Sequence, residues 1–187
     1  TKRNATIVSQ LIKRRRYKLY HIKHDKRVYK SANLICDGLA EMLKVKSYDE
    51  ISITDVCNIN GIARTTFYRL FDTLDDVLLY QFDNLFEQSI NKYKKDSDLG
   101  KSYAKMILKL AISNKTLITA IVKSRRYDIF LFSTRKKESQ LIQNIEVEMN
   151  KHDLMYCTPI LNQIAFVALE IWVENGCKES TEELYSI

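Results

Sequence analysis

The segment 60–71, which reads NGIARTTFYRLF, brings together groups that could bind a polyanion. Arg64 and Arg69 carry guanidinium groups, and Thr65 and Thr66 carry hydroxyl groups. These groups bind phosphate oxygens and the edges of nucleotide bases without any covalent step. Three apolar side chains are interleaved with them, at Phe67, Leu70 and Phe71. A helix with this composition needs an apolar core on one side and a polar partner on the other.

The elements that position this segment are predicted to be three short helices. Apolar residues recur at three- and four-residue steps over 29–45, which is typical of an amphipathic helix. Ser52 and Asp55 have the spacing of a capping box, so a second helix should begin there. Asn60 and Gly61 should end it, and a third helix should run over 63–71. Two helices joined by a glycine turn form a helix-turn-helix, whose second helix enters the major groove of DNA.

The polar side of the third helix is therefore predicted to contact DNA. Arg64, Thr65 and Arg69 would face the bases, whereas Thr66 and Tyr68 would hold the sugar–phosphate rim. Ordinary surface charge is the alternative for the arginines, and a core position is the alternative for Tyr68. The full set of predicted DNA-binding residues is Ser52, Arg64, Thr65, Thr66, Tyr68, Arg69, Lys13, Arg14, Arg15 and Arg16.

The positive charge is concentrated at the N-terminus. Residues 1–30 contain eleven Lys or Arg and one acid, a balance of +10, so the remaining residues carry 7 − 10 = −3 of the net charge of +7. We predict a basic arm over 1–28 that binds a polyanion. An anionic membrane surface and a solvated tail are the alternatives to nucleic acid.

The remainder of the chain is predicted to be helical, giving an all-α protein of about nine helices. The chain has 4 Gly and 1 Pro among 187 residues, too few for a protein built on turns and strands. Further helix starts are expected at Thr73, with Asp76 three residues on, and at Ser180 with Glu183. The other expected starts are Asp98, Asn114, a long segment over 127–150, and Thr158 with Pro159. We predict a DNA-binding domain over 29–73 and a C-terminal domain over 74–187.

Several classes of protein are not supported by the sequence. Catalytic motifs such as a glycine-rich phosphate loop, G-x-S-x-G or H-E-x-x-H do not occur, so we do not expect an enzyme. The widely spaced cysteines predict free thiols, and His21 and His24 have helical spacing but no third ligand, so we predict no metal site and no cofactor. No apolar run approaches the length of about 18 residues that spans a bilayer. We expect a cytoplasmic protein without a membrane partner.

The stretch SITDVCNINGIARTTFYRLFDTLDDVL resembles the DNA-binding signature of the TetR family of bacterial transcriptional regulators. Gly61, Ile62, Thr66, Tyr68 and Phe71 fall on the family's pattern. The resemblance implies a homodimer that binds a palindromic double-stranded operator, usually as a repressor. It also implies a C-terminal domain that binds an unknown small-molecule effector and holds the dimer together.

This resemblance suggests two further sets of residues in the C-terminal domain. Candidate effector-pocket residues are Met106, Leu110, Phe130, Phe132 and Tyr156, for each of which core packing is the plainer explanation. Candidate dimer-interface residues are Gln163, Phe166, Val167 and Glu170, which would pack as a four-helix bundle across the symmetry axis.

Three positions depart from the family's pattern, namely Ala63, Leu70 and Leu74. The corresponding positions often contact phosphates in the family, so their loss should weaken the hold on the DNA backbone. The basic arm is a natural replacement, because each phosphate contact releases counterions. The same departures would suit a protein of this fold that acts as an interaction adaptor or co-activator without specific DNA reading, and the arm would suit a membrane-surface protein.

Overall fold

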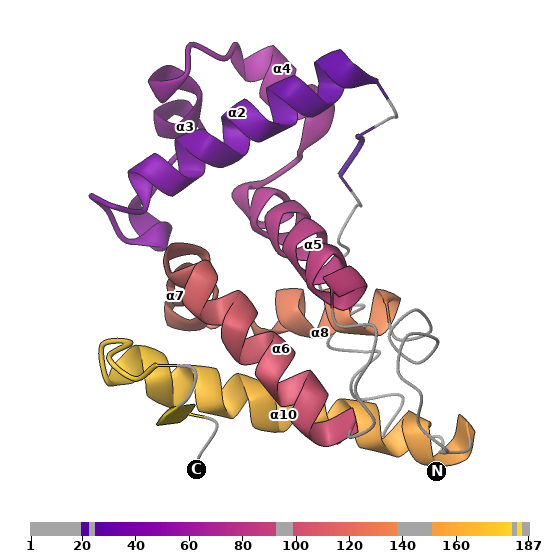
Figure 1. Cartoon of the computed structure of the whole chain (residues 1–187). Coiled ribbons are helices and arrows are strands. Elements are labelled where there is room, and N and C mark those ends of the chain that lie inside the picture. Colours follow the sequence, from indigo (N-terminus) through magenta and orange to yellow (C-terminus); the bar gives the residue numbers. More distant parts are fainter. Residues whose placement is uncertain (1–19, 23–24, 93–98, 138–150, 181–182, 185–187) are drawn as a thin grey trace. The chain divides into compact units, whose positions relative to one another are not determined.

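The protein is all-α, as predicted, and is shown in Figure 1. The computed structural model describes residues 20–22, 25–92, 99–137, 151–180 and 183–184, and these contain eight α-helices, one 3₁₀ helix and no strand. The chain divides into two compact units, Thr1–Gln81 and Phe82–Ile187. The division falls inside helix α5, Leu74–Lys92, so this one helix belongs to both units.

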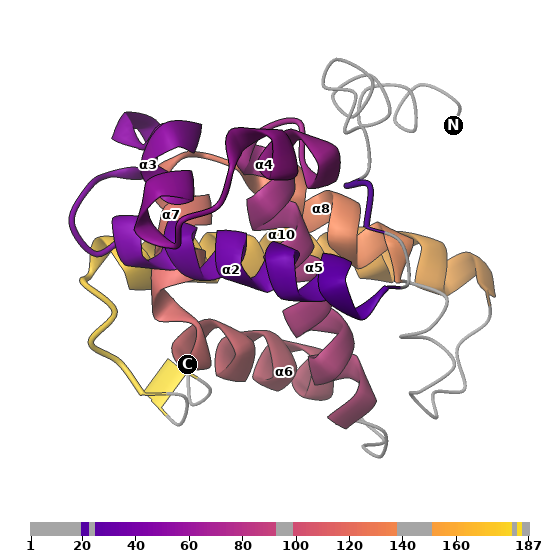
Figure 2. The same ribbon diagram turned by 90° about the horizontal axis from the view of Figure 1, so that it is seen from above.

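The first unit is built on helix α2, Lys26–Met42. A 3₁₀ turn, η1 (Tyr48–Glu50), leads to two helices of seven residues, α3 (Ile53–Ile59) and α4 (Arg64–Leu70). Helix α2 packs against both α3 and α4, which also pack against each other, and Figure 2 shows α2 crossing them. The core of this unit contains the buried side chains of Ile35, Leu39, Val56, Phe67, Leu70 and Phe71.

Helices α2 and α3 lie very close to each other at Gly38. A Cβ atom at this position would lie 2.6 Å from the carbonyl oxygen of Val56, and 3.3 Å from Cγ1 of the same residue. The shorter of these distances is well inside van der Waals contact. Because the carbonyl belongs to the backbone of α3, it could move aside only if α3 moved with it. Gly38 therefore sets the spacing between the two helices.

The second unit contains the remainder of α5 and four further helices. These are α6 (Leu99–Ser113), α7 (Lys115–Lys123), α8 (Tyr127–Lys136) and α10 (Lys151–Glu174). Helix α10 packs against α6, α7 and α8. The largest buried side chains of this unit include Phe82, Phe86, Ile90, Met106, Phe130, Phe166, Leu169 and Trp172. Aromatic rings join three of the helices, because Phe130 lies 5.4 Å from Phe82 and 5.8 Å from Phe166, measured between centroids.

Three predicted helix starts are confirmed by hydrogen bonds. Ser52 and Asp55 form a reciprocal capping box at the start of α3. Backbone N–H groups of Asp72 and Thr73 donate to the carboxylate of Asp76, at 3.1 and 2.9 Å, where α5 begins. The N–H of Ser180 donates to Glu183 at 2.7 Å, and the N–H of Glu183 donates back to the Ser180 hydroxyl. Such pairs are recognisable in a sequence because both partners lie within one turn.

The other predicted boundaries had different outcomes. Helix α2 begins at Lys26 and not near residue 29, because the side chain of Asp25 accepts a hydrogen bond from the N–H of Arg27. The predicted start at Asn114 is confirmed, because Asn114 is the N-cap of α7, although its side chain does not cap the helix and donates instead to the carbonyl of Leu110. The predicted cap at Asp98 and most of the segment 127–150 lie outside the described residues.

The predicted helix start at Thr158 and Pro159 was also wrong, because α10 begins at Lys151 and Pro159 lies inside it. Proline has no N–H, so one hydrogen bond of the helix is missing at this point, and its ring strains the preceding turn at a cost of about 3 kcal/mol. The buried side chains of Phe166, Leu169 and Trp172 lie on the same helix. Since each large apolar side chain contributes about 1.5–3 kcal/mol when it is buried, their packing offsets the cost of the proline.

Candidate nucleic-acid interface

The turn between α3 and α4 is fixed by backbone geometry and by one side chain. Gly61 has φ +60°, a left-handed conformation that glycine adopts without a Cβ clash. The N–H of Ile62 donates to the carbonyl of Cys57 at 2.9 Å, which closes the end of α3. The side-chain amide of Asn60 donates to the carbonyl of Leu34 in α2 at 2.7 Å. The turn that leads into α4 is therefore held by both α2 and α3.

Helix α4 has the two faces that its composition predicts. Phe67 and Leu70 are 0% and 1% exposed, and Phe71, which caps the helix, is fully buried. These side chains lie in the core with Val56 and Leu39, as expected from the sequence. The predicted DNA-contacting side chains lie on the other face: Arg64, Thr65, Tyr68 and Arg69 are exposed, and Thr66 is half-buried.

Arg64 and Tyr68 interact across one turn of α4. The guanidinium carbon of Arg64 lies 6.0 Å from the centroid of the Tyr68 ring. A hydrogen bond with Tyr68 raises the pKa of Arg64, so its positive charge is firmly kept. The same charge lies near Cys57, whose thiol pKa is nevertheless raised because burial dominates. The exposed face of α4 thus presents a cation that is already oriented by its neighbour.

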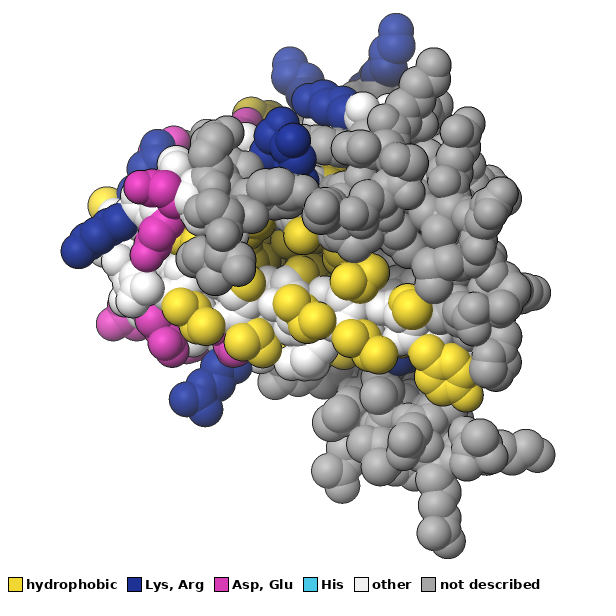
Figure 3. Space-filling model, turned by 60° about the horizontal axis from the view of Figure 1, so that its bottom comes forward, with side chains coloured by type: hydrophobic (Ala, Val, Ile, Leu, Met, Phe, Trp, Pro, Cys, Tyr) yellow, Lys and Arg dark blue, Asp and Glu magenta, His cyan; other side chains and the backbone are white. Residues whose placement is uncertain are grey.

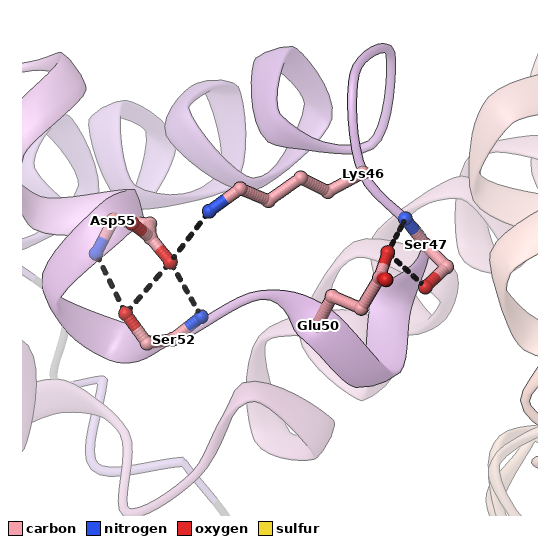
Figure 4. A network of polar contacts seen from close by, with 5 residues as sticks. All are labelled: Lys46, Ser47, Glu50, Ser52 and Asp55. Carbon is pink, nitrogen blue, oxygen red and sulfur yellow. Dashed lines mark hydrogen bonds and ion pairs between the residues drawn. The ribbon is translucent and has the colours of Figure 1, made fainter.

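Ser52 is placed at the start of α3 by a network that is drawn in Figure 4. Its hydroxyl lies 2.7 Å from a carboxylate oxygen of Asp55, and its N–H donates to the same oxygen at 2.9 Å. Lys46 adds an ion pair to this oxygen at 3.4 Å. The N–H of Ser52 is the main cause of the lowered pKa of Asp55. Immediately before, Ser47 and Glu50 form a second capping box of the same kind.

The segment 20–22, which lies within the predicted arm 1–28, contacts the end of α4. The N–H of His21 donates to the carbonyl of Leu70 at 2.9 Å, and its Nε2 lies 3.8 Å from a carboxylate oxygen of Asp72. The ring of Tyr20 meets that of Tyr80 edge-on, with 4.9 Å between centroids. Because Leu70 ends α4, its carbonyl has no partner within the helix, and His21 supplies one. The predicted arm residues Lys13, Arg14, Arg15 and Arg16 lie outside the described residues.

The five predicted effector-pocket residues lie in different environments. Met106, Leu110 and Phe130 are 1–4% exposed and belong to the core of the second unit. Phe132 is half-buried on α8, whereas Tyr156 is 50% exposed on α10. Tyr156 is therefore not grouped with the buried residues, and its part in a pocket stays a prediction.

Two polar contacts are buried within the second unit. The hydroxyl of Tyr103 in α6 donates to the amide oxygen of Asn162 in α10, and burial raises the pKa of this tyrosine. In α5, the carboxylate of Asp83 is 1% exposed and accepts hydrogen bonds from Ser133 and Lys136 of α8, at 2.5 and 2.6 Å. Buried groups of this kind are costly unless they are paired. The first contact joins α6 to α10, and the second joins α5 to α8.

A row of exposed apolar side chains runs along α10 and is visible in yellow in Figure 3. This apolar stripe consists of Tyr156, Ile160, Ile164, Val167 and Ile171, which are 41–60% exposed. Their spacing of three and four residues places them on one face of the helix. Isolated exposed apolar side chains are normal, whereas contiguous rows are typical of surfaces that bind a protein, a ligand or a membrane.

The predicted dimer residues lie on and beside this stripe. Val167 belongs to it, Gln163 is exposed next to it, and Glu170 is half-buried. Phe166 is 4% exposed and packs against Tyr127 at 4.5 Å between ring centroids. Phe166 therefore supports α10 from within the unit and has little surface left for a partner.

Sequence reasoning missed Ile160, Ile164 and Ile171, and also Tyr20 and His21. Among the described residues, no three His, Cys, Asp or Glu side chains gather as metal ligands would. Each helix in the described part of the chain is too short or too polar to cross a bilayer.

Comparison with known proteins gives a likeness in fold. No protein-family model matches the chain, and no curated protein sequence matches it. Among solved structures, the chain is similar to one titled dihydroxyacetone kinase operon activator DhaS. The TM-score is 0.55 and the sequence identity 20%, over 83% of this chain and 90% of that one. At this identity the similarity establishes the all-α fold of the two proteins.

Proposed function

We propose that the protein is a DNA-binding transcriptional regulator of the TetR type. The observation that carries this proposal is the division of α4 into a buried apolar face and an exposed face with Arg64, Thr65, Tyr68 and Arg69. A seven-residue helix held at its start by two other helices is the part of a helix-turn-helix that enters the major groove. The likeness in fold to a protein named as an operon activator supports the same class.

Within this proposal the residues of α4 have two different roles. Arg64 and Arg69 read bases, because a guanidinium can bond to both O6 and N7 of guanine. Tyr68 and Thr66 bind the sugar–phosphate backbone and set the register. Ser52 contacts a phosphate from the start of α3, although its hydroxyl is also engaged with Asp55.

The regulator acts as a homodimer on a palindromic operator. Two copies joined through their apolar stripes would bury Ile160, Ile164 and Ile171, which water otherwise covers. A two-fold axis brings the same patch of both copies together, and two reading helices then meet two half-sites in opposite orientation. Gln163 and Glu170 would form the polar rim of this interface.

The second unit is the part that responds to a small molecule or a partner. We place the effector among the apolar side chains around Met106, Leu110, Phe130 and Phe132, with the buried pair Tyr103–Asn162 as a polar element that could recognise it. Repression is implied by the TetR resemblance, whereas DhaS is named an activator. A reporter gene placed behind the recovered operator would show whether the protein represses or activates transcription.

The experiment is a selection from a pool of random duplexes, followed by sequencing of the bound fraction. Wild type would be compared with Arg64→Ala and Tyr68→Phe, with Arg135→Ala on α8 as the matched control for loss of an exposed arginine. We expect wild type to enrich a palindrome. Arg64→Ala should relax the preference at one base pair per half-site, at a cost of about 1–3 kcal/mol in discrimination. Tyr68→Phe should weaken binding to all sequences equally.

Failure to enrich any sequence, at any salt concentration, would contradict the proposal. In that case duplex binding would reflect only the charge of the arm. The interaction-adaptor and membrane-surface alternatives would then be tested by co-purification of partners and by vesicle flotation.

A further inference from the structure

Two ion pairs join α5 to α8 in the second unit, and each has one buried and one exposed partner. Asp83 on α5 accepts a hydrogen bond from the ammonium of Lys136 at 2.6 Å, and Glu87 accepts one from Lys137 at 2.5 Å. The side chain of Asp83 is 2% exposed, whereas that of Lys136 is 40% exposed. In the other pair the order is reversed, because Lys137 is 8% exposed and Glu87 is 50% exposed. Each buried charge is therefore neutralised by a side chain that reaches in from the surface.

The surroundings of Asp83 favour a bound ammonium group. One oxygen of its carboxylate accepts the hydroxyl of the fully buried Ser133 at 2.5 Å, and the other accepts Lys136. Next to Asp83 in the sequence, Phe82 packs against Phe130 of α8 at 5.4 Å between ring centroids. In such an apolar setting a carboxylate is costly without a cation, and its attraction to a cation is strong. Any ammonium group that reaches Asp83 could meet this requirement.

The two exposed partners can be exchanged more easily than the two buried ones. Lys136 and Glu87 have flexible side chains that already touch water, so their charged groups can turn outward and be hydrated. Asp83 and Lys137 cannot follow them, because both are surrounded by packed side chains. A ligand that carries both an ammonium and a carboxylate would replace both exposed groups at once. It would use the space that the ends of these two side chains now fill.

The spacing of the two acids on α5 selects the length of such a ligand. Asp83 and Glu87 are four residues apart, which places them on one face of the helix with a rise of about 6 Å between them. In an α-amino acid both charged groups are attached to one carbon, so they lie too close together to bridge this separation. An ω-amino acid carries its charges at opposite ends of a methylene chain and can bridge it.

We propose that Asp83 and Lys137 form the two ends of a binding site for a short ω-amino acid, such as γ-aminobutyrate or δ-aminovalerate. The ligand's ammonium replaces Lys136 on Asp83, and its carboxylate replaces Glu87 on Lys137. Each buried charge keeps an opposite partner after the exchange, which avoids the cost of an unpaired buried charge. This inference goes beyond the proposed function, because it concerns ligand binding by the second unit alone. A protein that reads no DNA could pass its test, and a DNA-binding protein could fail it.

The first test measures the binding of a series of ligands to the full chain by titration calorimetry at low salt. The series is glycine, β-alanine, γ-aminobutyrate and δ-aminovalerate, in which the separation of the two charges increases. Butylamine and butyrate are the matched controls, since each carries only one of the charges. We expect the affinity to rise along the series and to be highest for one of the two longest members. Each control should bind at least about tenfold more weakly than that ligand.

Each of three other results would overturn the proposal. If no member of the series binds, the two ion pairs serve only to join α5 to α8. If butylamine binds as well as the best ω-amino acid, Asp83 takes a simple cation and Lys137 has no part in the site. If glycine binds as well as δ-aminovalerate, the separation of Asp83 and Glu87 along α5 does not select the ligand.

Removing an exposed partner should strengthen ligand binding. In Lys136→Ala the ligand no longer competes with the protein's own ammonium for Asp83. If Lys136 occupies Asp83 in about 90% of the molecules, the apparent dissociation constant of the best ligand should fall about tenfold. The free variant should unfold at a lower temperature than wild type, and the ligand should restore much of the loss. Lys123→Ala on α7 is the matched control for the loss of an exposed lysine.

Asp83→Asn keeps the size of the side chain but removes its charge. We expect this variant to bind the best ligand at least about tenfold more weakly, whereas Asp49→Asn in η1, the matched control, should bind as wild type does. Thermal unfolding checks that each variant is folded. Unchanged binding in folded Asp83→Asn would place the ligand elsewhere and overturn the proposal. If Asp83→Asn does not fold, Lys136→Ala decides, since an affinity that does not increase in this folded variant overturns the proposal equally.

Discussion

Arg64 is the residue on which specific DNA reading depends most in this proposal. An arginine side chain loses about 2 kcal/mol of rotamer entropy when it is fixed in one geometry. The contact with Tyr68 restricts the guanidinium before any DNA is present. Part of the entropy loss therefore occurs on folding and no longer opposes binding. In this proposal Tyr68 therefore has two roles, because it binds the sugar–phosphate backbone and also restricts the side chain of Arg64.

At Cys36, burial should protect the thiol from reagents. This residue is 7% exposed, and burial raises its pKa, so almost no reactive thiolate is present. We expect maleimide to label Cys36 at least about 100-fold more slowly than the half-buried Cys157 and Cys177, because labelling requires local opening. Mass spectrometry of the native protein over time would measure the rates.

Labelling in denaturant provides the control, since all four thiols should then react alike. Equal rates for Cys36 and Cys177 in the native protein would contradict the burial of the α2 core.

At the scale of the helices, the residue at which a helix begins was easier to predict from the sequence than the side of the helix that is buried. Ser52, Thr73 and Ser180 were recognisable because a cap and its partner lie within one turn of chain. The buried face of α4 was predictable because polar and apolar residues segregate clearly along it. The contact of His21 with Leu70 joins segments about fifty residues apart, and no local pattern encodes such a pairing.

The sequence did not show which side of α10 is exposed, and the reason differs from that for His21. Helix α10 is apolar nearly all round, so its periodicity does not separate the residues that face the core from those that face outward. Gln163 and Phe166 were predicted at the interface with Val167, but Phe166 faces the core and the stripe runs through Ile160, Ile164 and Ile171. The choice depends on where α6, α7 and α8 pack, which is a tertiary property.

The start of α5 offers a test of helix capping. The carboxylate of Asp76 is 4% exposed and accepts hydrogen bonds from the N–H groups of Asp72 and Thr73. Asp76→Ala removes the acceptor from both, so we expect the free energy of unfolding to fall by about 1–3 kcal/mol. Urea denaturation followed by circular dichroism would measure the change.

Asp72→Ala is the matched control, because it removes a nearby carboxylate that is not the cap of α5. If the free energy of unfolding falls equally in the two variants, the effect comes from the loss of a local charge and not from the loss of the cap.

The apolar stripe of α10 is tested by placing a charge in its middle. Ile164 is 60% exposed, so Ile164→Glu should not disturb the core of one copy. In a dimer joined at this face, two carboxylates would be buried without partners, and we expect the dissociation constant to rise at least about thirtyfold. Sedimentation at several protein concentrations would measure it.

Gln163→Glu adds the same charge at the neighbouring exposed position and should have a much smaller effect. A dimer that survives Ile164→Glu unchanged would mean that another surface joins the two copies.

Across the whole molecule, three carboxylates in capping boxes should make the free energy of unfolding fall at low pH. Hydrogen bonds from Ser47, Ser52 and Ser180 lower the pKa values of Glu50, Asp55 and Glu183 respectively. A pKa that is lower in the folded than in the unfolded state contributes stability above the unfolded pKa, and this stability disappears as pH falls through the folded pKa. We expect the urea midpoint to decrease as pH falls below about 4.5.

Asp55→Asn should reduce this dependence, because one of the three carboxylates no longer titrates. Midpoints measured between about pH 6 and pH 3 would show the difference in slope. An unchanged slope in the variant would assign the acid sensitivity to other groups.

The close approach of α2 and α3 at Gly38 predicts how a Gly38→Ala allele should behave in a cell that also carries the wild-type allele. Gly38→Ala should push α2 away from α3 and disturb the unit that presents α4, whereas the α10 face lies in the other unit. If two copies pair through that face as proposed, a cell that makes both versions equally would have only about a quarter of its dimers with two intact DNA-reading units. The allele should therefore be partly dominant, and a reporter strain carrying both copies should respond more weakly than wild type but more strongly than a strain that lacks the regulator. A recessive allele would mean that the copies do not pair, or that one intact head is enough.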